Sequence, residues 1–110
     1  MATNYKVLGQ SNPSATTATS LYTVPSSTQA VVSTITICNQ ASTAGTFRVA
    51  VRPDGASLAA QHYIAYDTPI AANDTIALTL GVTLGDTDVI TVYASSATMS
   101  FAAFGSEITA

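Results

Sequence analysis

The chain has 110 residues, of which 47% are hydrophobic and only 8% charged, and its mean hydropathy is +0.35. This length accommodates one domain with one core, residues 1–110. The net charge is −3 and there are three basic side chains, too few to neutralise phosphates, so we expect no nucleic-acid partner. No apolar run approaches the roughly 20 residues that cross a bilayer, and we expect no membrane partner.

Serine, threonine and alanine fill most positions that charged residues would occupy in an average domain. A surface of hydroxyls and methyls is easily desolvated by another subunit, because few charges need pairing. Cys38 is the single cysteine and cannot form an internal disulfide. A domain this small without disulfides suits a reducing compartment, or stabilisation by neighbouring subunits. The N-terminal residues lack a basic patch followed by an apolar run, so we expect no signal peptide.

Apolar and polar residues alternate along most of the chain, a period typical of strands with one buried face. The alternation and the turn signals between its runs predict an all-β fold, a single antiparallel β-sandwich of about eight strands. Its topology is left open between jelly-roll and immunoglobulin-like. The predicted strands lie near residues 4–9, 19–24, 30–39, 46–52, 62–67, 75–81, 88–94 and 99–108.

Between the first two predicted strands, residues 11–20 are rich in serine, threonine and alanine and have no periodicity. This composition is typical of a surface loop. The alternative is an extended arm that lies on a neighbouring subunit.

The clearest alternation falls on residues 46–52 and 75–81, and Gly81 predicts a bend or bulge before Val82 and Leu84 continue the second run. The outward face of the first run carries Arg48 and Ala50. The inward faces of both runs predict the core residues Phe47, Val49, Val51, Ile76, Leu78 and Leu80.

Two proline-containing segments predict connections. Residues 52–55 (RPDG) fit a type I turn with proline second and glycine fourth. Residues 68–70 (TPI), flanked by Asp67 and Asp74, are expected to connect two strands. Only residues 55–61 could hold a helical turn.

The chain lacks the ingredients of common catalytic sites. His62 is the single histidine, and no glycine-framed elbow presents a serine nucleophile to it. We expect His62 to be a strand residue beside Ile64 and Tyr66 that hydrogen-bonds a neighbour. Cys38 has no basic neighbour that would favour a thiolate, and it is expected to be a small packed side chain. We therefore predict no catalytic residues and no enzyme activity.

Asp86 and Asp88 have the alternate spacing of some calcium loops, but the following glycine and distal glutamate of an EF-hand are missing. We expect their carboxylates to cap backbone amides in a turn, with an adventitious cation as the alternative. No metal ligand set and no cofactor site are predicted.

The aromatic residues contain one local cluster, formed by His62, Tyr63 and Tyr66. Tyrosines are favoured at interfaces, although they also occur as half-buried strand residues with hydroxyls at the rim. This cluster is the candidate surface-contact site.

Four segments resemble a group of small virion proteins of phages that infect aquatic bacteria, including cyanophages. They are NYKVLGQ (4–10), LYTVP (21–25), AYDTPIAANDT (65–75) and FGSEIT (104–109), and the resemblance extends over nearly the whole chain. It implies a structural component of a bacteriophage particle, assembled in the host cytoplasm. Its partners would be other virion proteins and copies of itself in a homo-oligomer.

Within this class the resemblance slightly favours a tail, baseplate or fibre component over a capsid cement (decoration) protein. A host- or carbohydrate-binding module on the virion surface is a further alternative, since His62, Tyr63 and Tyr66 could supply exposed aromatic rings.

Overall fold

A computed structural model describes residues 2–109 of the chain. These residues form nine strands, and the longest are the first, third and last. Their bounds are β1 Ala2–Ser11, β2 Thr19–Thr23, β3 Thr28–Asn39, β4 Gly45–Arg52, β5 Tyr63–Ile70, β6 Thr75–Leu78, β7 Val82–Leu84, β8 Val89–Ala94 and β9 Met99–Thr109. Two short 3-10 turns, η1 Pro53–Gly55 and η2 Ala60–His62, lie between β4 and β5. The all-β prediction is confirmed.

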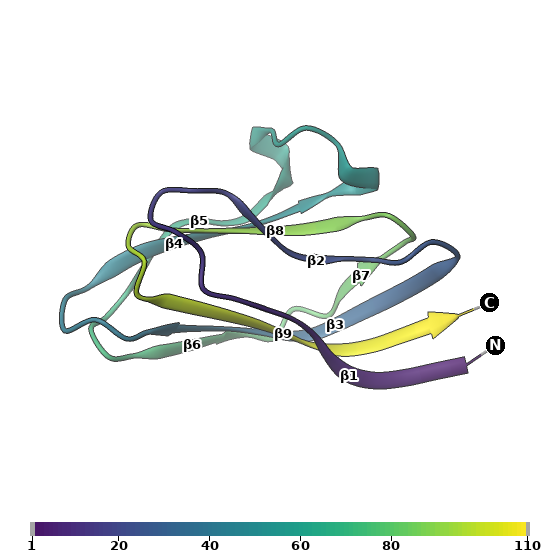
Figure 1. The fold of residues 1–110 in the computed structure, drawn as a ribbon, viewed down its shortest axis with the longest axis horizontal. Helices are drawn as coiled ribbons and strands as arrows, with labels where there is room; N and C mark the ends of the chain where they lie inside the picture. Colours follow the sequence, from purple (N-terminus) through teal and green to yellow (C-terminus); the bar gives the residue numbers. More distant parts are fainter. Residues whose placement is uncertain (1, 110) are drawn as a thin grey trace.

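The strands form two packed antiparallel sheets (Figure 1). One sheet has the order β1-β9-β3-β6, and the other has the order β2-β8-β4-β5. In the first sheet β7 also pairs with β3, along the same edge as β6 but nearer the start of β3. The pairs are nested, because β1 pairs with β9, β2 with β8, β3 with β6 and β7, and β4 with β5. A long hairpin wrapped into two sheets in this way is a jelly roll, which resolves the topology that the sequence leaves open.

The core lies between the two sheets and is built from their inward side chains. Phe47 of β4 and Phe101 of β9 come from opposite sheets, are 0% and 1% exposed, and meet edge to face with ring centroids 6.4 Å apart. Ile35 and Ile37 of β3 lie beside them in the same cluster. The predicted burial of Phe47 and Val49 is confirmed.

The predicted core is wrong at Leu80, which is 56% exposed. The strand β6 ends at Leu78, and Gly81 turns the backbone at a positive φ of 63° before β7 begins. The alternation therefore continues past the end of the strand that it marks. Val51, Ile76 and Leu78 are partly buried at the margin of the core.

Other segments also differ from their prediction. The TPI segment is strand and not a connection, since β5 runs through Ile70; Pro69 is tolerated because β5 is an edge strand. The connection between β1 and β2 covers residues 12–18, because both strands extend into the predicted loop at 11–20. Ala50, predicted to face solvent, is 1% exposed because the segment between β4 and β5 folds back over this part of β4.

The turn after β4 begins one residue later than predicted. The amide of Ala56 donates to the carbonyl of Pro53, and the two central residues Asp54 and Gly55 have positive φ angles of 54° and 67°. This is a type I′ turn, for which Asp-Gly is a preferred sequence, and not the predicted type I turn.

Asn39 fastens three loops at one end of the sandwich. Its side chain is 1% exposed, and its amide nitrogen donates to the carbonyls of Thr43 at 3.0 Å and Ala71 at 3.2 Å. Its amide oxygen accepts from the backbone N–H of Ala41 at 3.1 Å and from the hydroxyl of Thr98 at 3.4 Å. The loops after β3, β5 and β8 are thus held by one buried amide.

We expect Asn39→Asp to lower the free energy of unfolding at neutral pH by about 1–3 kcal/mol or more, because a carboxylate cannot donate to either carbonyl. Urea unfolding measures the change. The matched control is Gln40→Glu, at an exposed position where the amide donates only to the hydroxyl of Ser100. Equal stability losses in the two variants would contradict a fastening role for Asn39.

Candidate functional site

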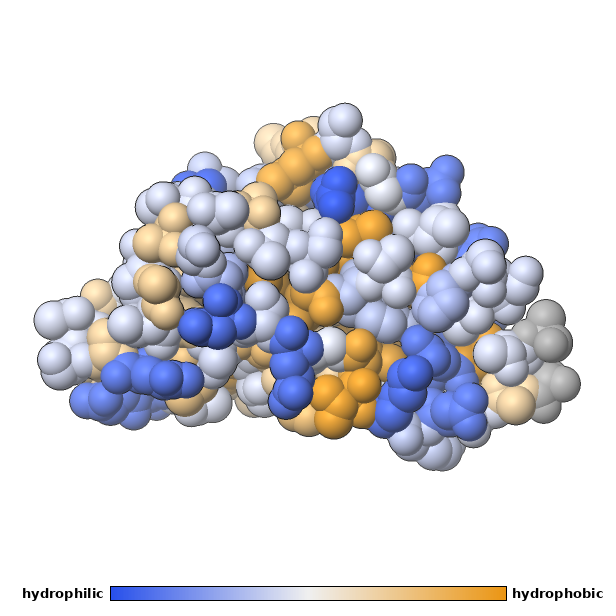
Figure 2. All heavy atoms as spheres, viewed as in Figure 1, coloured by the Kyte–Doolittle hydropathy of each residue, from blue (hydrophilic) through white to orange (hydrophobic). Residues whose placement is uncertain are grey.

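Of the predicted cluster, Tyr63 and Tyr66 lie together on the outer side of β5. Their rings meet edge to face with centroids 4.9 Å apart, and Tyr66 is 58% exposed. With Leu58, Ala59 and Ala60 they line an open hollow of about 650 Å³. Figure 2 shows hydrophobic residues at the molecular surface near the segment between β4 and β5.

A bulge in β5 brings this cluster to Arg48 of β4. Between the pairs Phe47–Thr68 and Val49–Ala65 the register shifts, so that Tyr66 and Asp67 together face the single residue Arg48. Asp67 has a positive φ of 48°, which accommodates the extra residue. One aromatic ring and one carboxylate are thereby aimed at the same guanidinium.

Arg48 is held between two aromatic rings. The central carbon of its guanidinium lies 4.2 Å from the ring centroid of Tyr66 and 4.2 Å from that of Tyr93. Tyr93 belongs to β8 and is paired directly opposite Arg48 in the ladder. Cation–π contact with both rings holds the guanidinium in place on the outer face of the sheet.

The guanidinium also forms a forked ion pair with Asp67, through Nε at 2.7 Å from Oδ1 and Nη2 at 3.3 Å from Oδ2. The Asp67 carboxylate raises the pKa of Arg48, and the guanidinium in turn lowers the pKa of Asp67. Both groups stay charged around neutral pH. The site offers flat aromatic surface and a fixed charge pair, which suits binding to another surface.

The structure separates His62 from the surface cluster. The side chain ends η2 and not a strand, it is 9% exposed, and its Nδ1 accepts the backbone N–H of Ala59 at 3.0 Å. The expected hydrogen bond to a neighbour is present, but the expected strand position beside Ile64 and Tyr66 is wrong. His62 supports the turn that carries the wall of the hollow and does not line it.

Sequence reasoning missed Arg48, Asp67 and Tyr93 as members of this site. The alternation already places Arg48 on the outer face of its strand, which is a usable signal. Its pairing with Tyr93 and the bulge at Asp67 depend on non-local register, which a single sequence does not specify.

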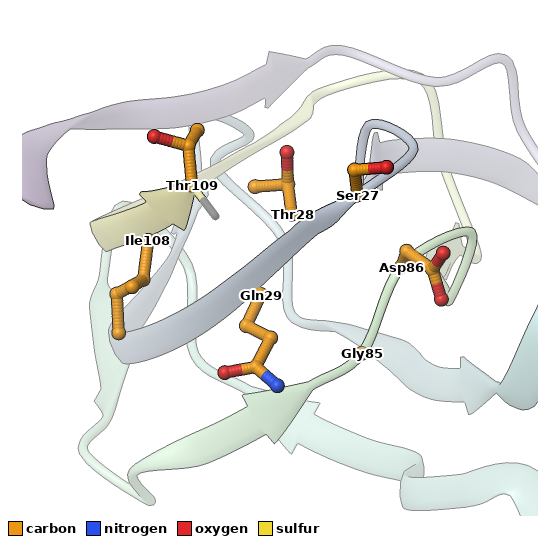
Figure 3. A pocket seen from close by; sticks show the side chains of 7 residues that line it. All are labelled: Ser27, Thr28, Gln29, Gly85, Asp86, Ile108 and Thr109. Carbon is orange, nitrogen blue, oxygen red and sulfur yellow. The ribbon is translucent and has the colours of Figure 1, made fainter. Parts of the chain in front are cut away.

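A second hollow, of about 480 Å³, lies at the end of the sandwich where β3 begins and β9 ends (Figure 3). Asp86 is its only ionisable lining residue. The others carry hydroxyl, amide or aliphatic groups, or no side chain, and are Ser27, Thr28, Gln29, Gly85, Ile108 and Thr109. Among residues 2–109, the hollow therefore brings no acidic and basic side chains together.

In the acidic turn before β8, the predicted capping of backbone amides is confirmed for Asp88, whereas the Asp86 side chain lines the hollow described above. The Oδ1 of Asp88 accepts the amide of Asp54 and its Oδ2 accepts the amide of Gly85, both at 2.8 Å. Across residues 2–109, no group of three or more histidine, cysteine or acidic side chains is placed to hold a metal. Cys38 is partly buried on the outer face of β3.

A second group of exposed apolar residues lies on the outer face of the other sheet, where β1 pairs with β9. Tyr5 and Val7 of β1 are 85% and 49% exposed, and Phe104 of β9, paired directly opposite Val7, is 36% exposed. We call these three residues the β1 patch. Hydrophobic residues are visible in Figure 2 where β1 and β9 run together.

A buried acid anchors β1 to the sandwich. Glu107 of β9 is 7% exposed, and it accepts the hydroxyl of Tyr22 of β2 at 2.5 Å and the ammonium of Lys6 of β1 at 2.9 Å. Lys6 and Tyr22 together hold the pKa of Glu107 below its ordinary value. Burial and the adjacent Glu107 raise the pKa of Tyr22.

We predict that the contacts of Glu107 with Lys6 and Tyr22 make the free energy of unfolding depend on pH in the acidic range. A carboxyl with a lowered pKa in the folded chain stabilises the fold above its unfolded pKa of about 4.3, and this contribution is lost as pH falls through the folded value. The urea midpoint of the wild type should therefore fall more steeply below about pH 4.5 than that of Glu107→Gln. Asp86→Asn, which removes an exposed carboxylate, is the control and should keep the wild-type slope.

No family model matches the chain, and no curated protein matches it significantly. None of the helical turns in residues 2–109 has the length and hydropathy to cross a membrane.

Proposed function

We propose that the protein is a non-enzymatic structural component of a bacteriophage particle, in which it mediates contacts with other virion proteins and with copies of itself. The observation that carries this proposal is the exposure of apolar and aromatic side chains on the outer faces of both sheets. Tyr5 and Val7 lie on one face, Ile64 and Tyr66 on the other. In a chain with so few charges, such surfaces are typical of contact with another subunit.

Two further observations support the proposal. The jelly roll is a recurrent architecture of viral capsid domains, although a fold alone does not specify a function. The four segments that resemble small phage virion proteins lie largely in β1, β2, β5 and β9 and in the connections beside them. A tail, baseplate or fibre position is favoured slightly, on the resemblance, over capsid cement.

The test is to purify phage particles that encode this chain and to locate it by mass spectrometry and cryo-electron microscopy. We expect a fixed copy number per particle and jelly-roll density in the tail, baseplate or fibres. Density on the head lattice would establish the cement role in its place. Absence of the chain from purified particles would overturn the proposal.

Salt provides a second measurement on the isolated protein. Exposed ion pairs contribute only about 0–1 kcal/mol each, so apolar contacts should dominate self-association. We expect association to change little between roughly 0.05 and 1 M salt, a range over which surface electrostatics are screened. Dissociation on adding salt would contradict contact through apolar surface.

A host- or carbohydrate-binding role is the second candidate, and the hollow beside Tyr63 and Tyr66 favours it. An exposed tyrosine ring next to the Arg48–Asp67 pair is the combination of apolar face and polar groups that sugars require. Screening against a glycan array should then show binding that Tyr66→Ala abolishes. The control Leu80→Ala, at an exposed leucine outside the hollow, should retain it.

A further inference from the structure

We propose that the free edge of β1 pairs antiparallel with β1 of a second copy about a two-fold axis at Tyr5, joining two sheets into one. This inference rests on the proposed function as an assembling subunit, and it names the partner and the surface. The evidence is the position of β1 in its sheet, the regular and exposed stretch of residues 2–7, and a register that opposes no like charges.

The strand β1 is exposed at the edge of its sheet. It is the outermost strand of its sheet and pairs with β9 on one side only. Every residue from 2 to 7 is exposed, on both faces of the strand. Backbone N–H and C=O groups therefore point from this edge into solvent, where another strand can pair with them.

The other edge strands of the two sheets are shorter than β1 or more irregular. At β5 the edge contains Pro69 and two register shifts, and β2 has five residues and one shift. The strands β6 and β7 are short and are separated by the turn at Gly81. Prolines, bulges and short length protect edges from pairing. With ten residues and no proline, β1 is the longest edge strand, and its one register shift lies beyond Val7, so residues 2–7 form a regular edge.

The register between the two copies of β1 is restricted by the geometry of the sheet. Side chains paired across a continuous sheet lie on the same face, so an antiparallel self-pair must be centred on a residue. The register of β1 on β9 shifts between Val7 and Gly9, which leaves residues 2–7 as the regular stretch. A centre at Tyr5 uses residues 3–7, opposes Tyr5 to its own copy, and opposes Thr3 to Val7 of the second copy. A centre at Lys6 would oppose two ammonium groups, which is unfavourable.

The charges on β1 are compatible with this register. With the axis at Tyr5, Asn4 lies opposite Lys6 of the second copy, so no like charges are opposed. Lys6 is the only charged residue of β1, and it is already neutralised by Glu107 of its own sheet. On the opposite face Tyr5 and Val7 continue into Phe104, so the two β1 patches would merge into one apolar strip across the axis. A second copy therefore opposes no like charge at this edge and continues its apolar face.

The experiment measures the mass of the full-length protein in solution by light scattering and native mass spectrometry across a concentration series. We expect a monomer–dimer equilibrium. Tyr5→Glu and Tyr5→Lys should each raise the dimer dissociation constant at least about tenfold, because each places two like charges at the axis. An equimolar mixture of the two variants should restore the dimer. Tyr5 is 85% exposed, so both should keep the wild-type circular dichroism spectrum.

Leu80→Glu is the matched control, because Leu80 is an exposed apolar residue beyond the end of β6, away from β1. It should leave the dissociation constant unchanged. The register is checked by Tyr5→Cys in a Cys38→Ala background, which should cross-link under mild oxidation. Thr3→Cys in the same background should not, since Thr3 lies opposite Val7 of the second copy.

A protein that stays monomeric at millimolar concentration, or a dimer that survives Tyr5→Glu and Tyr5→Lys alike, would overturn the inference. Either result leaves incorporation into particles to be decided by its own measurement. A Tyr5-dependent dimer that is absent from purified particles would overturn the proposed function and leave the two-fold pairing in place.

Discussion

Replacing Gly105 by alanine should give the largest loss of stability of any single methyl addition in this protein. Gly105 lies in β9, paired with Val32 of β3 at a shift in the register. A Cβ there would overlap the carbonyl oxygen of Val31 and approach the carbonyl carbon of Val31 at 2.9 Å and Cα of Val32 at 3.0 Å. These are backbone atoms of a strand held on both sides, so they cannot move aside as a flexible side chain can.

We expect Gly105→Ala to lower the free energy of unfolding by about 3 kcal/mol or more, the upper part of the range for overpacking. The measurement is the urea midpoint, or the soluble yield if the variant does not fold. Gly85→Ala is the control, since its Cβ would meet only the carboxylate of Asp88 at 3.7 Å. The control should change stability by less than about 1 kcal/mol. Two mild and equal effects would show that the β3–β9 contact is looser than described.

The second large effect is expected at the contact between the sheets. Phe47→Ala should lower the free energy of unfolding by about 3–5 kcal/mol, because the ring is fully buried and leaves a cavity. Phe101→Ala should be similar. Since the two rings touch, the double variant should lose less than the sum of the single losses, with a coupling of about 0.5–1.5 kcal/mol.

The control for Phe47 and Phe101 is Phe104→Ala, which also removes a phenyl ring, but from the outer face of β9. Phe104 is 36% exposed and paired with Val7, so its loss should cost about 1 kcal/mol or less. Measurements at low protein concentration separate this effect from the proposed self-association. A loss at Phe104 equal to that at Phe101 would mean that the outer face is packed like the core.

Local alternation predicted the strands well, but of the six core residues that it named only Phe47 and Val49 are fully buried. Phe47 and Val49 are buried because β4 keeps a period of two where it packs on the opposite sheet. The same rule failed at Leu80, since an alternating sequence continues where the hydrogen-bonded strand has already ended. It failed again at Pro69, because tolerance of proline depends on whether the strand is at an edge, and a local sequence does not state its neighbours.

The candidate site shows the same division. Tyr63 and Tyr66 were predicted because they are close in sequence. The contact of Tyr66 with Arg48 depends on a bulge in β5, and the second ring on Arg48, that of Tyr93, comes from β8, more than 40 residues after Arg48 in the chain. His62 was misplaced because a 3-10 turn interrupts the alternation before β5.

The nested pairing of the strands also constrains the order in which the chain can fold. The two strands of the innermost pair, β4 and β5, are joined by one short segment, but β1 pairs only with β9, the last strand of residues 2–109. Pairings between distant segments form slowly, because a long loop must close before any contact compensates for it. Until β9 has been synthesised, the backbone N–H and C=O groups on both edges of β1 have no partner strand. In that interval the nascent chain is most vulnerable to pairing with the wrong strand.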